Sequence, residues 1–117
     1  MEGNKFFRSF KFAGQGIAAA VKRESNMKFH LAAAVAVILA AAMTGISSAE
    51  WLIIILLIGG MLALEMINTA IERVVDLASP ERHPLAKESK DIAAGAVLVF
   101  AAASAIIGIL IFLPKWF

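Results

Sequence analysis

Residues 51–71 read WLIIILLIGGMLALEMINTAI, an apolar run with a single acidic residue near its end. A helix rises about 1.5 Å per residue, so a run of this length reaches across about 30 Å, the thickness of the hydrocarbon core of a bilayer. Residues 29–46 and 92–113 form two further apolar runs of similar length. We therefore expect three transmembrane helices, one in each of these runs.

The composition of the whole chain agrees with a membrane protein. Of its 117 residues, 61% are hydrophobic and 17% are charged, and the mean hydropathy is +0.83. A soluble domain of this size exposes too much of its surface to carry so many apolar side chains. The composition thus excludes an ordinary soluble enzyme, a disordered segment and a nucleic-acid-binding module. The chain has no cysteine, which excludes disulfides, zinc–thiolate sites and cysteine nucleophiles.

Residues 4–24 predict a different kind of helix. Apolar side chains recur there every three to four positions, and the basic side chains fall largely on the other side. A short basic amphipathic helix of this kind is typical of the membrane surface. A solvated leader without a partner is the alternative. The predicted fold is therefore all-α and integral to the membrane, with residues 1–117 in a single domain of one surface helix and three transmembrane helices.

The positions of the basic residues predict the orientation in the membrane. Of the 11 lysines and arginines, six precede the first apolar run and four lie between the second and third, which leaves only Lys115 on the other side. Short cytoplasmic loops concentrate lysine and arginine, so we expect a cytoplasmic N-terminus. The polar segment 76–90, with Pro80 and Pro84, is then the expected cytoplasmic break between the second and third helices.

Four polar residues share one face at the end of the second helix. At about 100° per residue, Glu65, Asn68, Glu72 and Asp76 fall within an arc of about 80°. A charged side chain at the bilayer centre costs about 2.5–3.5 kcal/mol, so a purely structural role is hard to justify. Hydrogen bonding between helices would suit Asn68 alone. Two acids on one stripe repel each other unless a cation or a proton lies between them, which indicates a functional site.

The depth of each acid in the membrane suggests its role. Measured from Trp51 along the helix axis, Glu65 lies about 21 Å away and Glu72 about 31 Å away. Glu65 is then inside the cytoplasmic leaflet, where a lipid headgroup could reach it, and Glu72 is at the edge, where a water-soluble ligand could. Glu24 precedes the first span and Lys90-Asp91 opens the third. Carboxylates without cysteine or a histidine pair favour a hard ion such as Mg²⁺.

Other polar residues near the membrane edge have plainer interpretations. Lys28 and Lys90 could be anchors whose long side chains extend to the interface. Asp91 could be an ordinary acid at a helix N-terminus. We interpret His30 as an interfacial residue rather than a base, and His83 as a residue of an exposed loop.

The polar stripe of the second helix lies within residues 65–76, which read EMINTAIERVVD, and residues 90–97 read KDIAAGAV. Together these two segments resemble the prokaryotic diacylglycerol kinase family. Residues 26–30 and 79–87 are most similar to its Gram-positive branch, whose members are undecaprenol kinases. The resemblance implies a kinase in the bacterial plasma membrane that transfers the γ-phosphate of ATP to a membrane lipid alcohol. The implied acceptor is undecaprenol, giving undecaprenyl phosphate, and diacylglycerol is the alternative. Mg²⁺ and a homotrimer with sites at the cytoplasmic interface are also implied.

The resemblance further implies roles for individual residues. Glu65 matches the catalytic base, and Asn68 beside it organises the acceptor and the phosphate. Glu24 and Glu72 match the pair that holds Mg²⁺ on the nucleotide. The remaining matches are nucleotide contacts: Lys90, Asp91, Glu81, Arg82 and His83, together with Lys5 and Phe12, which replace an arginine and a tyrosine of better-known members.

Two other classes of protein compete with this interpretation. A small proton-coupled exporter would need its key carboxylate near the middle of the bilayer, with access from both sides. The acidic stripe instead collects at one edge beside Lys90 and Asp91, which favours the kinase. A structural subunit would leave the acidic stripe unexplained.

Overall fold

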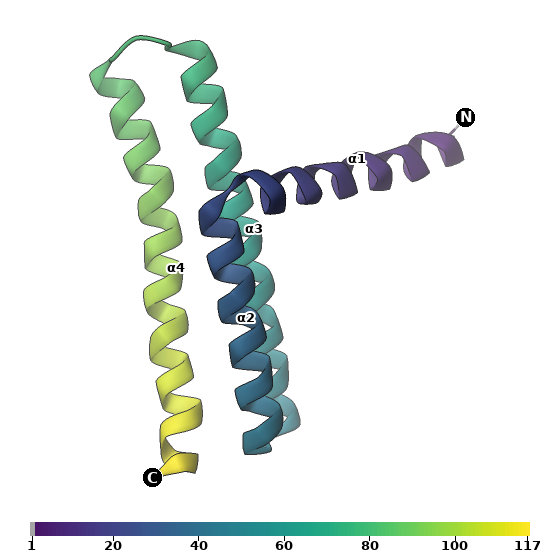
Figure 1. Cartoon of the computed structure of the whole chain (residues 1–117), viewed down its shortest axis with the longest axis vertical. Helices are drawn as coiled ribbons and strands as arrows, with labels where there is room; N and C mark the ends of the chain where they lie inside the picture. The colour runs from purple at the N-terminus through teal and green to yellow at the C-terminus, as the bar shows by residue number, and fades with distance from the viewer. Residues whose placement is uncertain (1) are drawn as a thin grey trace.

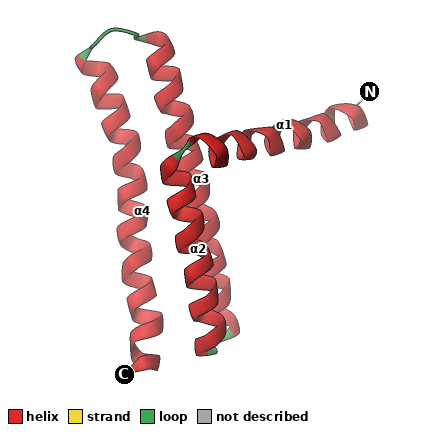
Figure 2. Cartoon of the chain, viewed as in Figure 1, coloured by secondary structure: helices red, strands yellow, loops and turns green. Residues whose placement is uncertain are grey.

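The computed structural model describes residues 2–117, which form four α-helices: α1 (Glu2–Arg23), α2 (Ser25–Thr44), α3 (Ser48–Ala78) and α4 (Pro84–Trp116). Figure 1 shows α2, α3 and α4 running side by side, while α1 leaves this bundle sideways. The connections are short (Figure 2). Helices α2, α3 and α4 are each long and apolar enough to cross a membrane. The predicted all-α fold of three such helices and an N-terminal helix is confirmed.

Helix α1 meets α2 at a single non-helical residue, Glu24, whose φ of −108° and ψ of 118° are extended. This residue turns the chain, so α1 projects away from the bundle (Figure 1). On one side of α1, Phe6 packs edge-on against Phe7 and Phe10, and these three side chains are between 61% and 72% exposed. A helix with such an uncovered aromatic face is suited to lie against an apolar phase.

A tight turn joins α2 to α3. Gly45 ends α2 in the left-handed region at φ 77°, which glycine adopts without strain, and its amide donates to the Ala41 carbonyl at 3.0 Å. The helix therefore ends at Thr44, two residues before the end of the apolar run. Ser47 and Glu50 then form a capping box, in which each side chain accepts a hydrogen bond from the other residue's amide.

Helices α3 and α4 extend well beyond their apolar runs. The sequence analysis expected a polar break over residues 76–90, but the loop covers only residues 79–83. The first amide of a helix has no hydrogen-bond partner within the helix, so a proline at that position costs no hydrogen bond. Pro84 therefore begins α4 rather than interrupting it. The Nδ1 atom of His83 caps the same helix by accepting from the Leu85 amide at 3.1 Å. Lys90 and Asp91 consequently lie inside α4, past its first turn, and not at its start.

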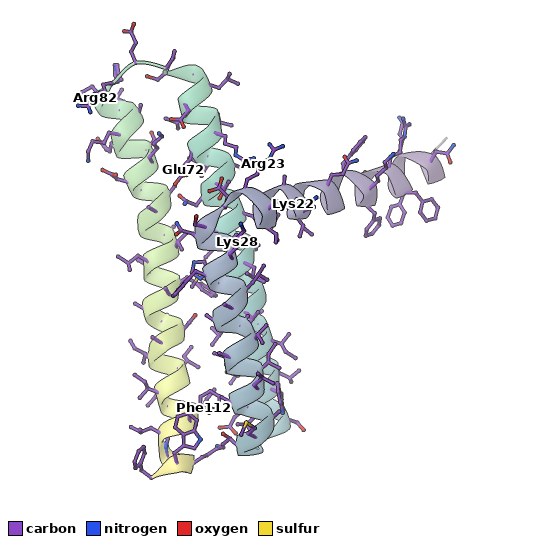
Figure 3. All side chains as sticks on the ribbon, in the orientation of Figure 1. Lys22, Arg23, Lys28, Glu72, Arg82 and Phe112 are labelled. Atoms are coloured by element: carbon purple, nitrogen blue, oxygen red, sulfur yellow. The ribbon has the colours of Figure 1, made fainter. Side chains whose placement is uncertain are left out.

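The apolar core lies at the end of the bundle farthest from the α3–α4 loop. Its buried side chains come from all three helices and include Ala41, Ile54 and Phe112. Two polar contacts join the helices at the same end. Lys115 of α4 forms an ion pair with Glu50 of α3 at 2.8 Å, and the Trp116 indole donates to the Thr44 hydroxyl of α2 at 2.9 Å. Figure 3 shows Phe112 at one end of the bundle and Arg82 at the other. The opposite half of the bundle carries the buried polar groups.

Candidate active site

The polar stripe of α3 changes from buried to exposed along the helix. Glu65 is 3% exposed, and Asn68 and Thr69 are each 5% exposed. Glu72, one turn farther, is half-buried, and the side chain of Asp76 is 64% exposed. The stripe therefore starts inside the protein and becomes exposed toward the end of α3.

His30 of α2 lies against Glu65. Its Nε2 atom is 3.6 Å from the Glu65 Oε2 atom, an ion-pair distance that is longer than a hydrogen bond. The side chains of His30 and Glu65 are 17% and 4% exposed, so the contact is almost closed to solvent. Sequence reasoning interpreted His30 as interfacial and missed this contact, because the two residues are far apart in the chain.

Asn68 holds Glu72 and leaves one of its own atoms without a partner. The Asn68 amide nitrogen donates to Glu72 Oε1 at 3.1 Å. The Asn68 Oδ1 atom is buried and accepts no hydrogen bond from any group in residues 2–117. A buried polar atom left unpaired costs about 1–3 kcal/mol, so this oxygen is poised to meet a donor or a cation that the single chain does not supply.

Arg73 fixes the second acid of the predicted metal pair. The Arg73 guanidinium donates to Glu24 Oε1 at 2.9 Å and so ties the start of α2 to α3, one residue from Glu72. In Figure 3, Glu72 lies at about the level where α1 meets the bundle. The sequence analysis did not assign Arg73 a role, although its position next to Glu72 was visible.

The donor set suits one mode of Mg²⁺ binding. Within residues 2–117, no group of three or more His, Asp or Glu side chains is placed to hold a metal ion by itself. Mg²⁺ in phosphoryl-transfer sites, however, is usually bound by one or two carboxylates together with substrate phosphates. The carboxylates of Glu24 and Glu72 and the free Asn68 Oδ1 are hard oxygen donors of the required kind.

A pocket of about 620 Å³ lies at the α3–α4 loop. We call it the hairpin pocket; Glu81, Arg82, His83 and Lys90 line it, and these are four of the predicted nucleotide contacts. Lys90 forms an ion pair with Asp76, and this pair joins α4 to α3 beside the pocket. The pocket carries both basic and acidic side chains, and among its basic residues Lys87 and Lys90 are in ion pairs with acids.

Three predicted contacts lie apart from these groups. Asp91 forms an exposed ion pair with Lys87 on its own helix, at 2.6 Å. Lys5 and Phe12 belong to α1, which projects away from the bundle, and both side chains are exposed. Within the described part of one chain, these three residues do not meet the Glu72 carboxylate.

An apolar groove of about 440 Å³ runs between α2, α3 and α4. Helices α2 and α4 pack mainly against α3 and less against each other, which leaves the groove between them. Its lining is almost entirely apolar, and His30 and Ser104 are the polar side chains in it. Since His30 also contacts Glu65, the groove ends close to the buried acid.

Comparison with known proteins gives matches over almost the whole chain. Residues 11–112 match the prokaryotic diacylglycerol kinase family. An undecaprenol kinase of Bacillus subtilis (strain 168) is 57% identical over 97% of this chain and 93% of that protein. A diacylglycerol kinase of Synechocystis is 39% identical over 91% of this chain and 61% of that protein. A diacylglycerol kinase of Helicobacter pylori (strain J99) is 32% identical over 81% of this chain and 74% of that protein. These matches confirm the resemblance and favour a kinase over an exporter.

Proposed function

The chain belongs to the prokaryotic diacylglycerol kinase family and is a multi-pass membrane kinase with an alcohol as acceptor, and we propose that its acceptor is undecaprenol. ATP is the co-substrate that a kinase of this family implies. The proposed product is undecaprenyl phosphate. Support for the polyprenol comes from the 57% identity to an undecaprenol kinase over nearly the full length of both chains.

One observation supports a lipid acceptor above all others: the apolar groove ends at His30, which contacts the buried Glu65. An apolar chain would lie in the groove out of water, and its terminal hydroxyl would reach Glu65. Glu65 would accept the hydroxyl proton as general base, because a carboxylate within hydrogen-bond reach of the attacking oxygen can take its proton. Asn68, one helical turn along, would orient the hydroxyl and the phosphate.

The nucleotide would bind on the solvent side of Glu65. We propose that Glu24 and Glu72 hold Mg²⁺, which when bound neutralises charge on the phosphates. Lys90 and Arg82 would contact the nucleotide from the hairpin pocket. Phosphoryl transfer needs mainly positioning and charge neutralisation, which is what these carboxylate and basic side chains can supply.

Replacing Glu72 with glutamine should weaken the binding of Mg–ATP about tenfold or more, about 1.4 kcal/mol. Glutamine keeps an oxygen that can accept from Asn68, so the local fold is preserved while one metal-binding charge is lost. The measurement is a titration with a fluorescent ATP analogue at varied Mg²⁺. Glu50→Gln is the matched control, because it makes the same change on the same helix at the far end of the bundle. Equal affinity for Glu72→Gln and wild type would remove Glu72 from the metal site.

Purified protein given labelled ATP, Mg²⁺ and a panel of lipids should phosphorylate undecaprenol faster than diacylglycerol. The expectation follows from the identity to the Bacillus subtilis undecaprenol kinase, which exceeds the identity to each diacylglycerol kinase compared. The rates should be compared in several detergents, since acceptor solubility differs among them. Equal or reversed rates in all of them would make diacylglycerol the acceptor.

We also propose that the protein is a homotrimer with its active sites on the cytoplasmic side of the plasma membrane. The orientation is supported by the position of the basic residues, because the hairpin pocket and the start of α2 lie at the same end of the bundle. The oligomer is supported by the unpaired Asn68 Oδ1 and by the separation of Asp91, Lys5 and Phe12 from Glu72. Chemical crosslinking in membranes tests the number of subunits.

A further inference from the structure

We propose that His30 is a positioning residue for phosphoryl transfer: the Nε2 atom of its neutral imidazole takes over the proton that Glu65 removes from the lipid hydroxyl, and the resulting imidazolium then holds the Glu65 carboxylate in place. The proposal rests on the function proposed above and adds a residue to it. The sequence analysis gave His30 no such role.

The first support is the geometry of the contact. The 3.6 Å between His30 Nε2 and Glu65 Oε2 is short enough to close to a hydrogen bond by a small movement of either side chain. Contacts of this kind are often long without substrate and shorten when it binds. Because the two side chains are 17% and 4% exposed, water has little access to compete for the proton.

The second support is the distribution of positive charge around the buried acid. Arg73 forms an ion pair with Glu24, and Lys90 forms an ion pair with Asp76. Within residues 2–117, His30 is the one charge-bearing partner that lies within ion-pair distance of Glu65. Once His30 has taken up the proton, its imidazolium pairs with the Glu65 carboxylate, which at 3% exposure would otherwise be an isolated buried charge.

The third support is that His30 touches both the acid and the apolar groove. Its side chain lines the groove, while Glu65 lies behind it and is almost fully covered. A proton taken up by Glu65 therefore has His30 as its nearest acceptor. Imidazole is suited to this task because it exchanges protons in the neutral pH range.

The proposed step conserves atoms and charge. The lipid hydroxyl oxygen forms a bond to the γ-phosphorus, and the bond from this phosphorus to the β–γ bridging oxygen breaks, with its electron pair leaving on ADP. The hydroxyl proton passes to the Glu65 carboxylate and from there to His30 Nε2, which becomes an imidazolium. The imidazolium then releases the proton to water, which restores the pair.

His30→Gln and His30→Ala separate this role from simple packing. Glutamine can still donate a hydrogen bond to Glu65 but cannot take a proton. We expect kcat to fall about tenfold or more for His30→Gln, with the KM for the lipid and the Kd for nucleotide unchanged. The loss for His30→Ala should be larger, and added imidazole should restore part of its rate. The same imidazole should have no effect on Glu65→Gln, which serves as the control.

A double variant gives a readout that a structural role would not produce. If His30 acts through Glu65, Glu65→Gln combined with His30→Gln should be no slower than Glu65→Gln alone. Wild-type kcat for His30→Gln, or losses that multiply in the double variant, would overturn the proposal while leaving the kinase assignment in place. Full activity of Glu65→Gln would overturn it as well, because His30 would then have no base to serve. A wild-type protein that phosphorylates no lipid alcohol would instead overturn the proposed function.

Discussion

Replacing Glu65 with glutamine is expected to lower kcat about 100-fold or more while ATP binding survives. A general base contributes about 10²- to 10⁴-fold, and an amide of the same shape cannot accept the hydroxyl proton. Glu65 is 3% exposed and lies on the membrane side of Glu72, so its loss should leave the proposed metal pair intact. An effect on kcat without an effect on nucleotide affinity is the signature of a group that acts in the transition state.

The measurement combines steady-state rates with a nucleotide titration on the same preparation. Glu50→Gln again provides the control, since it replaces a carboxylate of α3 that faces Lys115 at the other end of the bundle. The control should keep nearly full turnover. Unchanged turnover for Glu65→Gln would show that the base is another residue, and loss of ATP binding would place Glu65 in the nucleotide site instead.

The three membrane helices could be predicted because bilayer thickness fixes the length of an apolar run. The ends of these helices could not be predicted, because a helix can continue past the end of its apolar run. Residues 72–78 contain neither glycine nor proline, and α3 continues through them to Ala78. The second proline of the expected break, Pro84, begins α4 instead of ending a helix. Helical residues beyond the apolar runs therefore carry part of the hairpin pocket.

The acidic stripe could be predicted because it lies on one helix, where spacing alone sets the angle between side chains. Contacts between helices depend on their register, which spacing does not give. The tight turn at Gly45 makes α2 and α3 antiparallel neighbours, with His30 before that turn and Glu65 after it. The same pairing brings Glu24 to Arg73. A short turn makes the two helices antiparallel neighbours, but the offset of these contacts from a symmetric pairing comes from helix packing, which spacing does not give.

The site of a single chain remains in two groups. Asn68 holds Glu72 on α3, and Arg73 beside Glu72 holds Glu24 at the start of α2, whereas Asp91 forms its exposed ion pair with Lys87 on α4. No hydrogen bond or ion pair joins Glu72 to Asp91 in the part of the chain that the structure describes. If both residues contact one nucleotide, the simplest arrangement takes Glu72 from one subunit and Asp91 from its neighbour.

Mixed oligomers of Glu72→Ala and Asp91→Ala chains are therefore expected to regain activity that neither variant has alone. In every trimer that contains both kinds of chain, one of the three sites built from neighbouring chains has both groups intact, so about a third of wild-type activity should return in the doubly purified trimers. The two chains are co-expressed with different tags and purified through both tags in succession. Two Glu72→Ala chains carrying the same tags form the control, which should stay inactive.

The outcome of mixing distinguishes a shared site from a site within one chain. If Glu72 and Asp91 serve the same chain's site, every site in a mixed oligomer lacks one of them, and activity stays at the level of the single variants. Recovery of both tags in one crosslinked species shows that mixing took place, so inactivity in that species would contradict the shared site. Full activity of a monomer in detergent would contradict it too, because the groups that a single chain holds apart would then suffice for transfer.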